Sequence, residues 1–374
     1  MRQAFTAERV FDGQRMVGRA TVVVEDGRIT ALETREVPDA TDLGDVTLLP
    51  GLIDAHVHLC LDEDPDIIPT MQLDDEALLV RMQAAAAKTL ASGVTTVRDL
   101  GDRSFLALEV GGPLTVLASG PPLTSKGGHC WFWGGEVETV DDMLRAVEER
   151  AERGCHVVKV MTSGGNVTPG SSLLDIQFTV DELRVVVDEA HRLGLSTAAH
   201  CHAPDAVRNA VNAGFDTLEH LSWATEEGVD ADYAVLQRLV DEQRVLSATF
   251  GNLPGAVPPP AIAARLEQAK VHWLWLAERH ARIIVGSDAG ISPGKPHGVL
   301  PHALMTLLPV MGGERALATL TSMPAGGLGL GGRKGVLAPG ADADLLAVRG
   351  DPSTDADALL DVVGVWVGGE PVPR

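Results

Sequence analysis

The sequence predicts an α/β protein whose central part is a (β/α)8 barrel of the TIM-like type. Between about residues 50 and 334, short apolar strand-like runs alternate with helical stretches. Such alternation is typical of parallel strands joined by helical crossovers. The chain has 374 residues, a normal length for a barrel with a small second module.

Eight apolar runs account for the strands of this barrel. They lie near residues 52–58, 95–100, 114–119, 157–161, 196–200, 217–221, 245–250 and 283–288. Seven helical crossovers are expected between them, among them Asp74 to Ser92, Asp141 to Arg153 and a helix that begins at the capping-box pattern Thr179-Val180-Asp181-Glu182. A further helix is expected near residues 314–323. In this fold the active site lies at the carboxyl ends of the strands.

Residues that can bind metal ions stand at or near the ends of five of these strands. They are His56, His58, Lys159, His200, His220 and Asp288. An apolar strand has no reason of its own to carry such residues at its end. His56 and His58 are two positions apart, so they point to the same face and can hold one ion together. Because imidazoles and carboxylates are good ligands for zinc and its neighbours, the pattern predicts a metal-dependent hydrolase site.

Lys159 is the unusual member, since a protonated amine cannot bind a cation. It stands inside Val157-Val158-Lys159-Val160-Met161, where burial would lower its pKa. A neutral amine can add carbon dioxide and become a carbamate, an anionic ligand with two oxygens that can bridge two metal ions. The alternative is a lysine at a strand end paired with an acid. The five other candidate ligands at corresponding strand ends favour the carbamate.

Several motifs in order along the chain resemble the amidohydrolase superfamily, and within it the imidazolonepropionase-like branch that includes Xaa-Pro and Xaa-Arg dipeptidases (the prolidase type). The resemblance extends from about residue 50 to residue 350. The matching segments are 50–58, 93–101, 127–129, 159–165, 189–194, 200–202, 219–220, 286–290 and 340–345.

The resemblance implies how the site is assembled. His56, His58 and Asp288 would hold one divalent ion, His200 and His220 would hold the other, and the carbamate of Lys159 would bridge them. Zinc is the expected metal. Such a pair lowers the pKa of a bridging water, and one ion polarises the scissile carbonyl. Asp288 would act as the base that takes the water's proton and passes it to the leaving amine.

Three further histidines are candidates for contact with the substrate. His129 follows Gly127-Gly128, and in similar dipeptidases a histidine at this place contacts the substrate; an ordinary surface histidine is the alternative. His202 is two residues after His200 and could orient a carboxylate or oxyanion. With Asp288, His129 and His202 are the candidate catalytic residues. His297 lies in a Pro-His-Gly segment that relatives share and is a candidate substrate contact.

An aromatic cluster lies beside His129. Trp131, Phe132 and Trp133 account for three of the 14 aromatic residues of the chain. Their place in an active-site loop makes Trp131 and Trp133 candidates for an apolar substrate wall, with a buried structural cluster as the alternative. Relatives carry smaller or polar residues here, so the Xaa-Pro or Xaa-Arg preference is not transferred. The loop from Asn252 to Pro260 is expected to form a rim, and Arg98 and Asp99 are expected to form an ion pair under the site.

The two chain ends predict a second module. Residues 1–49 contain short alternating runs separated by the turn signals Asp12-Gly13 and Asp26-Gly27, and residues 335–374 contain similar runs. Neither end is large enough for a stable core alone. As in the family, both are expected to join in one small composite β-sandwich, which leaves residues 50–334 for the catalytic barrel.

Composition restricts the partners. The formal charge of −22, from 30 basic and 52 acidic residues, argues against nucleic acid and anionic membranes. The four cysteines show no Cys-x-x-Cys pair or disulfide pattern, so they are expected to be reduced. The amino terminus lacks an apolar signal core, and no run of 18 apolar residues occurs, which makes the cytoplasm the expected location. A homo-oligomer is left open.

Three functional hypotheses follow. The first is a binuclear amidohydrolase that cleaves an amide bond of a dipeptide or N-acyl amino acid with an apolar or aromatic group. The second uses the same site on a cyclic amide, a carbamate or a biosynthetic intermediate. The third is a non-catalytic scaffold, which the filled set of six ligand positions disfavours. Fold alone does not decide the substrate.

Overall fold

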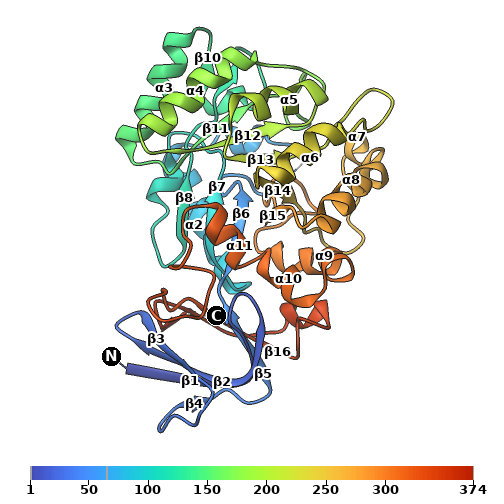
Figure 1. Ribbon diagram of the computed structural model, residues 1–374. Helices are drawn as coiled ribbons and strands as arrows, with labels where there is room; N and C mark the ends of the chain where they lie inside the picture. Colours follow the sequence, from blue (N-terminus) through green and yellow to red (C-terminus); the bar gives the residue numbers. More distant parts are fainter. Residues whose placement is uncertain (1, 65, 374) are drawn as a thin grey trace.

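The barrel is built from eight parallel strands, in agreement with the eight runs in the sequence. In the computed structural model, which describes residues 2–64 and 66–373, these strands surround a common centre (Figure 1). They are β6 (Leu52–Val57), β7 (Val94–Asp99), β8 (Thr115–Ala118), β11 (Val157–Met161), β12 (Ser196–Cys201), β13 (Thr217–His220), β14 (Val245–Thr249) and β15 (Arg282–Gly286).

Two parallel sheets make up this barrel, and hydrogen bonds at both junctions join them. The sheets have the orders β6-β7-β8 and β11-β12-β13-β14-β15. At one junction Leu123 N donates to Lys159 O at 2.8 Å, and at the other Asp288 N donates to His56 O at 2.7 Å. The second junction places the first and last candidate ligands of the chain side by side. The register pairs Met161 with His200, so the fourth and fifth strands end at the same edge.

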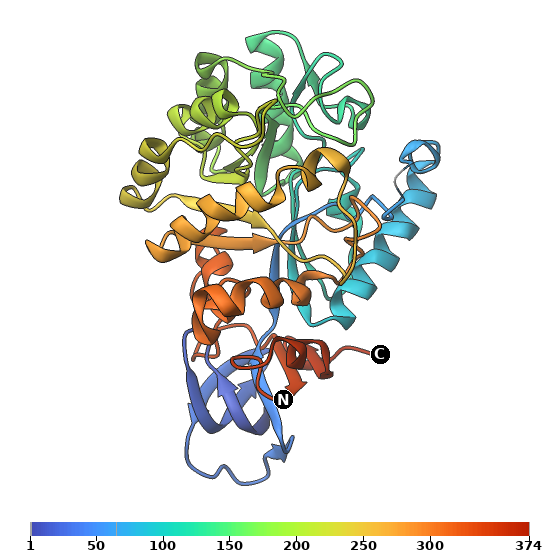
Figure 2. The ribbon, with the colours of Figure 1, turned by 90° about the vertical axis from the view of Figure 1, so that its right-hand side faces the viewer.

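Helices cover the outside of the barrel (Figure 2), and their starts follow from local capping chemistry. The main ones are α2 (Asp75–Ala91), α3 (Val140–Arg153), α4 (Val180–Arg192), α5 (Pro204–Ala213), α6 (Tyr233–Asp241) and α8 (Leu266–Glu278). The predicted capping box before α4 is present, because the side chain of Thr179 accepts from Glu182 N and the side chain of Glu182 accepts from Thr179 N. Shorter helices are α1 (Ile68–Met71), α7 (Pro260–Ala263) and α9 (Ala303–Met311).

Two expected helices differ in the structure. The crossover from β7 to β8 contains only a short 3-10 turn at Leu106–Glu109, because Gly111 and Gly112 follow it with φ of 64° and 76° and direct the chain into the next strand. The helix expected near 314–323 is divided into α10 (Gly313–Ala318) and α11 (Ser322–Gly327). Pro324 has no N–H to donate to the carbonyl of Leu320, which accepts from Ile53 N at 2.9 Å instead.

The two chain ends meet in one eight-stranded sheet below the barrel (Figure 1). Its strands are β1 (Arg2–Phe11), β2 (Met16–Glu25), β3 (Arg28–Glu33), β4 (Thr41–Asp42), β5 (Val46–Pro50), β16 (Leu345–Arg349), β17 (Val362–Val367) and β18 (Glu370–Pro371). The sheet closes over its own core: the rings of Phe5 and Trp366 are 5.1 Å apart, and Ile29 N donates to Ala341 O at 2.8 Å. The domain boundaries near residues 49 and 335 stay a prediction.

Across residues 2–64 and 66–373, no helix has both the length and the apolar character needed to cross a membrane. The cysteines are all free and buried.

Candidate metal centre

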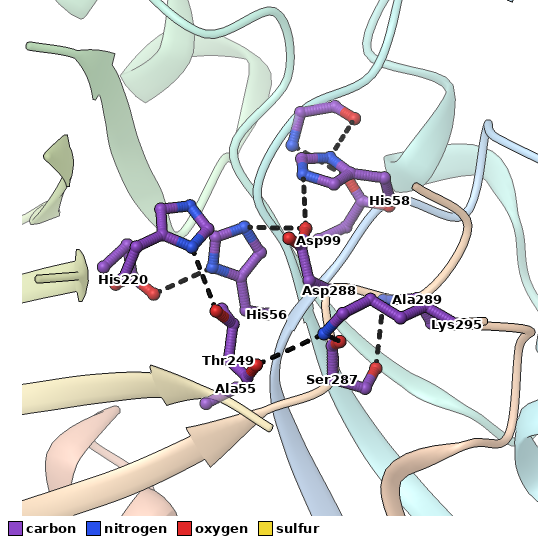
Figure 3. A network of polar contacts seen from close by, with 12 residues as sticks. Ala55, His56, His58, Asp99, His220, Thr249, Ser287, Asp288, Ala289 and Lys295 are labelled. Carbon is purple, nitrogen blue, oxygen red and sulfur yellow. Dashed lines mark hydrogen bonds and ion pairs between the residues drawn. The ribbon is translucent and has the colours of Figure 1, made fainter. Parts of the chain in front are cut away.

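His56, His58 and Asp288 form the first group of donor atoms. Their donor atoms all lie within 4.8 Å of one another. Asp288 Oδ1 is 3.6 Å from His56 Nε2 and 3.5 Å from His58 Nε2 (Figure 3). Two donors that bind one zinc ion at a tetrahedral angle are about 3.4 Å apart, given metal–ligand distances near 2.1 Å. The spacing therefore fits a shared ion.

Hydrogen bonds direct the free nitrogens of both histidines toward Asp288. The Nδ1–H of His56 donates to Glu219 Oε2 at 2.9 Å, and that of His58 donates to the carbonyl of Gly101 at 3.1 Å. Each ring therefore presents the lone pair of Nε2 to the carboxylate of Asp288. Ligand histidines are ordinarily held in this way by a second acceptor.

His200, His202 and His220 form a second group, also with donor atoms within 4.8 Å of one another. His200 Nε2 donates to the carbonyl of Gly164 at 3.1 Å, which leaves Nδ1 for a ligand. His202 Nδ1 contacts Ser222 Oγ at 2.7 Å, and His220 Nδ1 contacts Thr249 Oγ1 at 3.1 Å. The sequence predicted His200 and His220 as ligands; the structure places beside them His202, which was expected to be a catalytic residue and to contact substrate.

These histidines are buried, apart from the half-buried His220, and burial favours their neutral form. Burial lowers the pKa of His202 to about 3, and it lowers the pKa of His56, His200 and His220 well below the ordinary value. While its amine is protonated, Lys159 lowers the pKa of each of them further. Neutral imidazole is the form that binds a metal ion. The rings of His56 and His220 are 5.0 Å apart, so the two groups are neighbours.

Lys159 lies among these histidines with its amine unused. The side chain is fully buried, and in the described part of the chain its Nζ has no hydrogen-bond partner. Burial lowers its pKa to about 8. A buried amine without a partner is costly, and the cost is removed if the amine carries an anionic group that binds cations on both sides. The donor set and this orphaned amine fit a pair of divalent ions, and no acidic partner of the kind considered as the alternative is within hydrogen-bond distance.

Two of the ligands occupy a backbone conformation that their residue types rarely adopt. His220 has φ of 69° and Asp288 has φ of 59°, both in the left-handed region. Each is placed where its strand turns into a loop. Strained residues of this kind persist where the surrounding structure holds them, and they cluster at functional sites.

Glu219 is a candidate functional residue for which no role was predicted. It accepts from His56 Nδ1 through one oxygen, and through the other it accepts from Arg98 Nη2 at 2.8 Å. The expected ion pair between Arg98 and Asp99 is wrong: Asp99 accepts from the backbone N–H groups of Leu59 and Gly101. Adjacent residues of a strand point to opposite faces, so the two side chains cannot meet. In the sequence, the available signal for Glu219 was an acidic residue at the end of a strand-like run, directly before the candidate ligand His220.

Asp54 supports the other end of the site. Its two oxygens accept from the hydroxyl of Ser287 at 2.6 Å and from Ser287 N at 2.8 Å. Burial raises the pKa of Asp54 to about 6. Because Ser287 directly precedes Asp288, these bonds fix the turn that carries the ligand.

Replacing Glu219 with glutamine should weaken metal binding about 10- to 100-fold, the usual effect of losing a partner that orients a ligand histidine. The amide group cannot accept from both His56 and Arg98. The affinity of the apoenzyme for zinc should be measured by competition with a chelator, with folding checked by circular dichroism. Glu149→Gln, which alters only an exposed ion pair with Arg153, is the control. Equal affinities in Glu219→Gln and the wild type would remove Glu219 from the site.

A cavity of about 250 Å³ opens over both groups of ligands. Lys159, His58, Asp288 and the second histidine group lie at its floor. Its walls are largely apolar, and most of the wall comes from the rim loop after β14 and from α7 and α8. The apolar wall residues include Met161, Leu173, Phe250, Val257, Pro258, Ile262, Trp273 and Ile291. Val257 borders the cavity and is 89% exposed, so its side chain is free to contact an apolar group of a ligand.

Among the predicted substrate contacts, His129 and His202 border this cavity. His129 is buried, which excludes a surface role; its ring is 4.8 Å from that of His200, and its Nδ1 contacts Thr168 Oγ1 at 3.0 Å. Burial lowers the pKa of His129 to about 3. A neutral ring nitrogen is therefore available beside the second group of ligands.

Trp131, Trp133 and His297, which were predicted to bind substrate, are not among the residues that line this cavity. A 3-10 turn at Trp131–Trp133 places Trp133 behind the ring of His58, 5.2 Å away, and leaves Trp131 44% exposed. His297 is buried and its Nε2 donates to the carbonyl of Leu61 at 2.8 Å. Of these three side chains, Trp133 is the one whose ring packs against that of the candidate ligand His58.

Comparison with known proteins identifies the family to which the chain belongs. A model of the amidohydrolase family matches residues 47–372. The chain is 27% identical over 373 aligned positions to an ochratoxinase from Aspergillus niger, covering 86% of this chain and 75% of that protein. It is 26% identical to an imidazolonepropionase from Paracoccus denitrificans, covering 92% and 91%. A solved Xaa-Pro dipeptidase with bound methionine shares the fold, with a TM-score of 0.89, 23% identity and 99% of each chain covered.

Proposed function

The chain belongs to the amidohydrolase family and is a hydrolase of C–N bonds, and from this premise we propose that it is a binuclear enzyme that cleaves the amide bond of a dipeptide or an N-acyl amino acid. One observation carries the proposal: two groups of candidate ligands, five histidines and the carboxylate of Asp288, lie around the unpartnered amine of Lys159. Lys159 in its carbamate form would bridge two divalent ions, with zinc the expected metal.

The residues of the chain have distinct roles in this reaction. Two divalent ions bound here would lower the pKa of a water and polarise the scissile carbonyl. Asp288 takes the proton of the attacking water and delivers it to the leaving amine, since its carboxylate lies at the cavity floor. His129 lies beside His200 and is placed to contact the oxygen of the substrate carbonyl. The apolar wall excludes water from the reacting groups.

The apolar wall also indicates which chemical groups the substrate carries. Phe250, Ile262 and Trp273 offer an apolar surface opposite the ligands, which supports a substrate with an apolar or aromatic group. This assigns the wall to the rim loop, α7 and α8 in place of Trp131 and Trp133. The similarity to an imidazolonepropionase keeps a cyclic amide as the second candidate.

Metal analysis and a substrate panel test the proposal together. Purified enzyme should carry close to two divalent ions per chain, and removing them with a chelator should abolish hydrolysis. A panel of dipeptides, N-acyl amino acids, cyclic amides and carbamates should give its highest kcat/KM with an apolar N-acyl amino acid or dipeptide. Full activity with one ion or none would contradict the binuclear site, and a clear preference for cyclic amides would favour the second candidate.

Substitutions in the two candidate walls distinguish them. Ile262→Ala should lower kcat/KM for an apolar substrate by up to about sixtyfold, because it removes three carbon atoms that a bound apolar group would cover, at about 0.8 kcal/mol each. Trp131→Ala, on an exposed side chain away from the cavity, should leave kcat/KM nearly unchanged. The reverse pattern would return the substrate wall to the aromatic cluster.

A further inference from the structure

A second lysine borders the cavity without belonging to either ligand group. Lys295 lies in the loop after β15, and its Nζ donates to the carbonyl of Ser287 at 2.6 Å and to the carbonyl of Thr249 at 3.2 Å (Figure 3). Both acceptors are next to the metal centre: Ser287 precedes Asp288, and the side chain of Thr249 contacts His220. The ammonium group is therefore fixed between the ends of β14 and β15.

This ammonium group has one donor to spare. An ammonium has three N–H groups, and two of those of Lys295 are used by the backbone carbonyls. Lys295 also borders the cavity, so the remaining N–H is available to a bound molecule. Burial lowers the pKa of Lys295, whereas the carboxylates of Asp288 and Asp54 oppose that shift. Among the described residues, no carboxylate lies within ion-pair distance of its Nζ.

The other cations of the cavity wall are placed differently. Arg265 donates to the carbonyls of Thr225, Gly228 and Ala261, so much of its guanidinium is used within the rim. Lys270 is exposed at the rim and pairs with Glu267 at 2.5 Å. Lys295 is thus the cavity cation that is both held rigidly beside the ligands and without an acidic partner.

We propose that Lys295 binds the free carboxylate of the substrate and makes the enzyme selective for acids over the corresponding amides. The inference rests on the proposed function and specifies its substrate class: dipeptides and N-acyl amino acids end in such a carboxylate. A hydrogen bond from an ammonium to a carboxylate is charge-assisted and short, and burial at the cavity wall strengthens it. The fixed position of Nζ also aligns the scissile bond over the two ligand groups, because the carboxylate carbon is two bonds from the amide nitrogen.

Binding of a matched pair of ligands tests this role without reliance on turnover. The probes are N-methanesulfonyl-L-phenylalanine and N-methanesulfonyl-L-phenylalaninamide. A sulfonamide replaces the scissile amide in both, so that bond is not hydrolysed, and the two differ only in the carboxylate, which is a carboxamide in the second. Their dissociation constants should be measured calorimetrically with the metal-loaded enzyme. The wild type should bind the acid more tightly than the amide, and Lys295→Met should weaken binding of the acid about 10- to 100-fold while changing binding of the amide less than threefold. Lys295→Arg should retain part of the preference for the acid.

Two controls separate the alternatives. Lys126→Met removes an exposed ion pair with Glu138 and should leave both constants unchanged. Arg265→Gln should keep the preference for the acid; loss of the preference in this variant instead of in Lys295→Met would overturn the assignment. Equal weakening of acid and amide in Lys295→Met, with a lower melting temperature, would show that the lysine only holds β14 and β15 together.

The same measurements distinguish this inference from the proposed function. If the wild type binds the acid more tightly through Lys295 but hydrolyses no amide in the panel, the proposed reaction is wrong and the carboxylate site stands. If amides are hydrolysed while the acid and the amide bind equally well to the wild type, the reaction stands and the role of Lys295 is wrong.

Discussion

Lys159→Ala should lose nearly all activity and the ability to hold both ions. The carbamate oxygens are the only anionic ligand proposed to be shared by the two groups, so their removal separates the ions. Loss of several kcal/mol of transition-state stabilisation corresponds to a fall in kcat/KM of at least about 10³-fold. Short carboxylic acids such as acetate should restore part of the activity by filling the bridging position.

The burial of Lys159 gives this prediction a pH dependence. Carbon dioxide adds only to the neutral amine, and burial lowers the pKa of Lys159 to about 8. Below that value the amine is protonated, so carbamate formation in the metal-free enzyme should slow as the pH falls and quicken as it rises. Uptake of ¹³C-labelled bicarbonate, followed by NMR, would measure this. Lys159→Ala should show no such signal, and Lys126→Ala, at an exposed position, should behave as the wild type.

Full activity of Lys159→Ala with two bound ions would remove the carbamate from the mechanism. Loss of activity together with loss of folded structure would instead identify Lys159 as a structural residue. Rescue by acetate distinguishes these outcomes, because a small acid can replace a bridging ligand but cannot refold a chain.

Asp288→Asn should reduce kcat by about 10² to 10⁴, the range for losing a general base, while metal content falls little. The amide keeps the size of the side chain and one oxygen directed at His56 and His58, but it cannot accept the proton of the attacking water. Asparagine also tolerates the left-handed backbone of this position, with φ of 59°, so the turn should be preserved. Steady-state kinetics would measure the fall in kcat, and metal analysis of the same preparation would measure the metal content.

Asp181→Asn is the matched control, since that carboxylate lies in the exposed first turn of α4. It should have wild-type kinetics. If Asp288→Asn kept nearly full kcat with both ions bound, another group would be the base, and His129 and His202 would be the first to test because they border the same cavity.

The sequence by itself determined the barrel and indicated which residues would meet as candidate ligands. A period of two along a strand places His56 and His58 on one face, and the alternation of strands and helices sets all strands parallel. In a parallel barrel the carboxyl ends share one edge, so residues at strand ends must converge whatever the loops do. For this reason six residues spread from position 56 to position 288 could be assigned to one site before any coordinates were considered.

The tertiary structure decided what the loops and neighbouring strands contribute. Glu219 orients His56, and Arg98 is bonded to Glu219, because the barrel brings β6, β7 and β13 together around one buried acid. A 3-10 turn directs Trp133 behind His58 and away from the cavity. Lys295 meets the carbonyls of Thr249 and Ser287 only when β14 and β15 lie side by side. Side-chain direction in a loop depends on individual φ and ψ angles and long-range contacts, which have no period that a sequence can display.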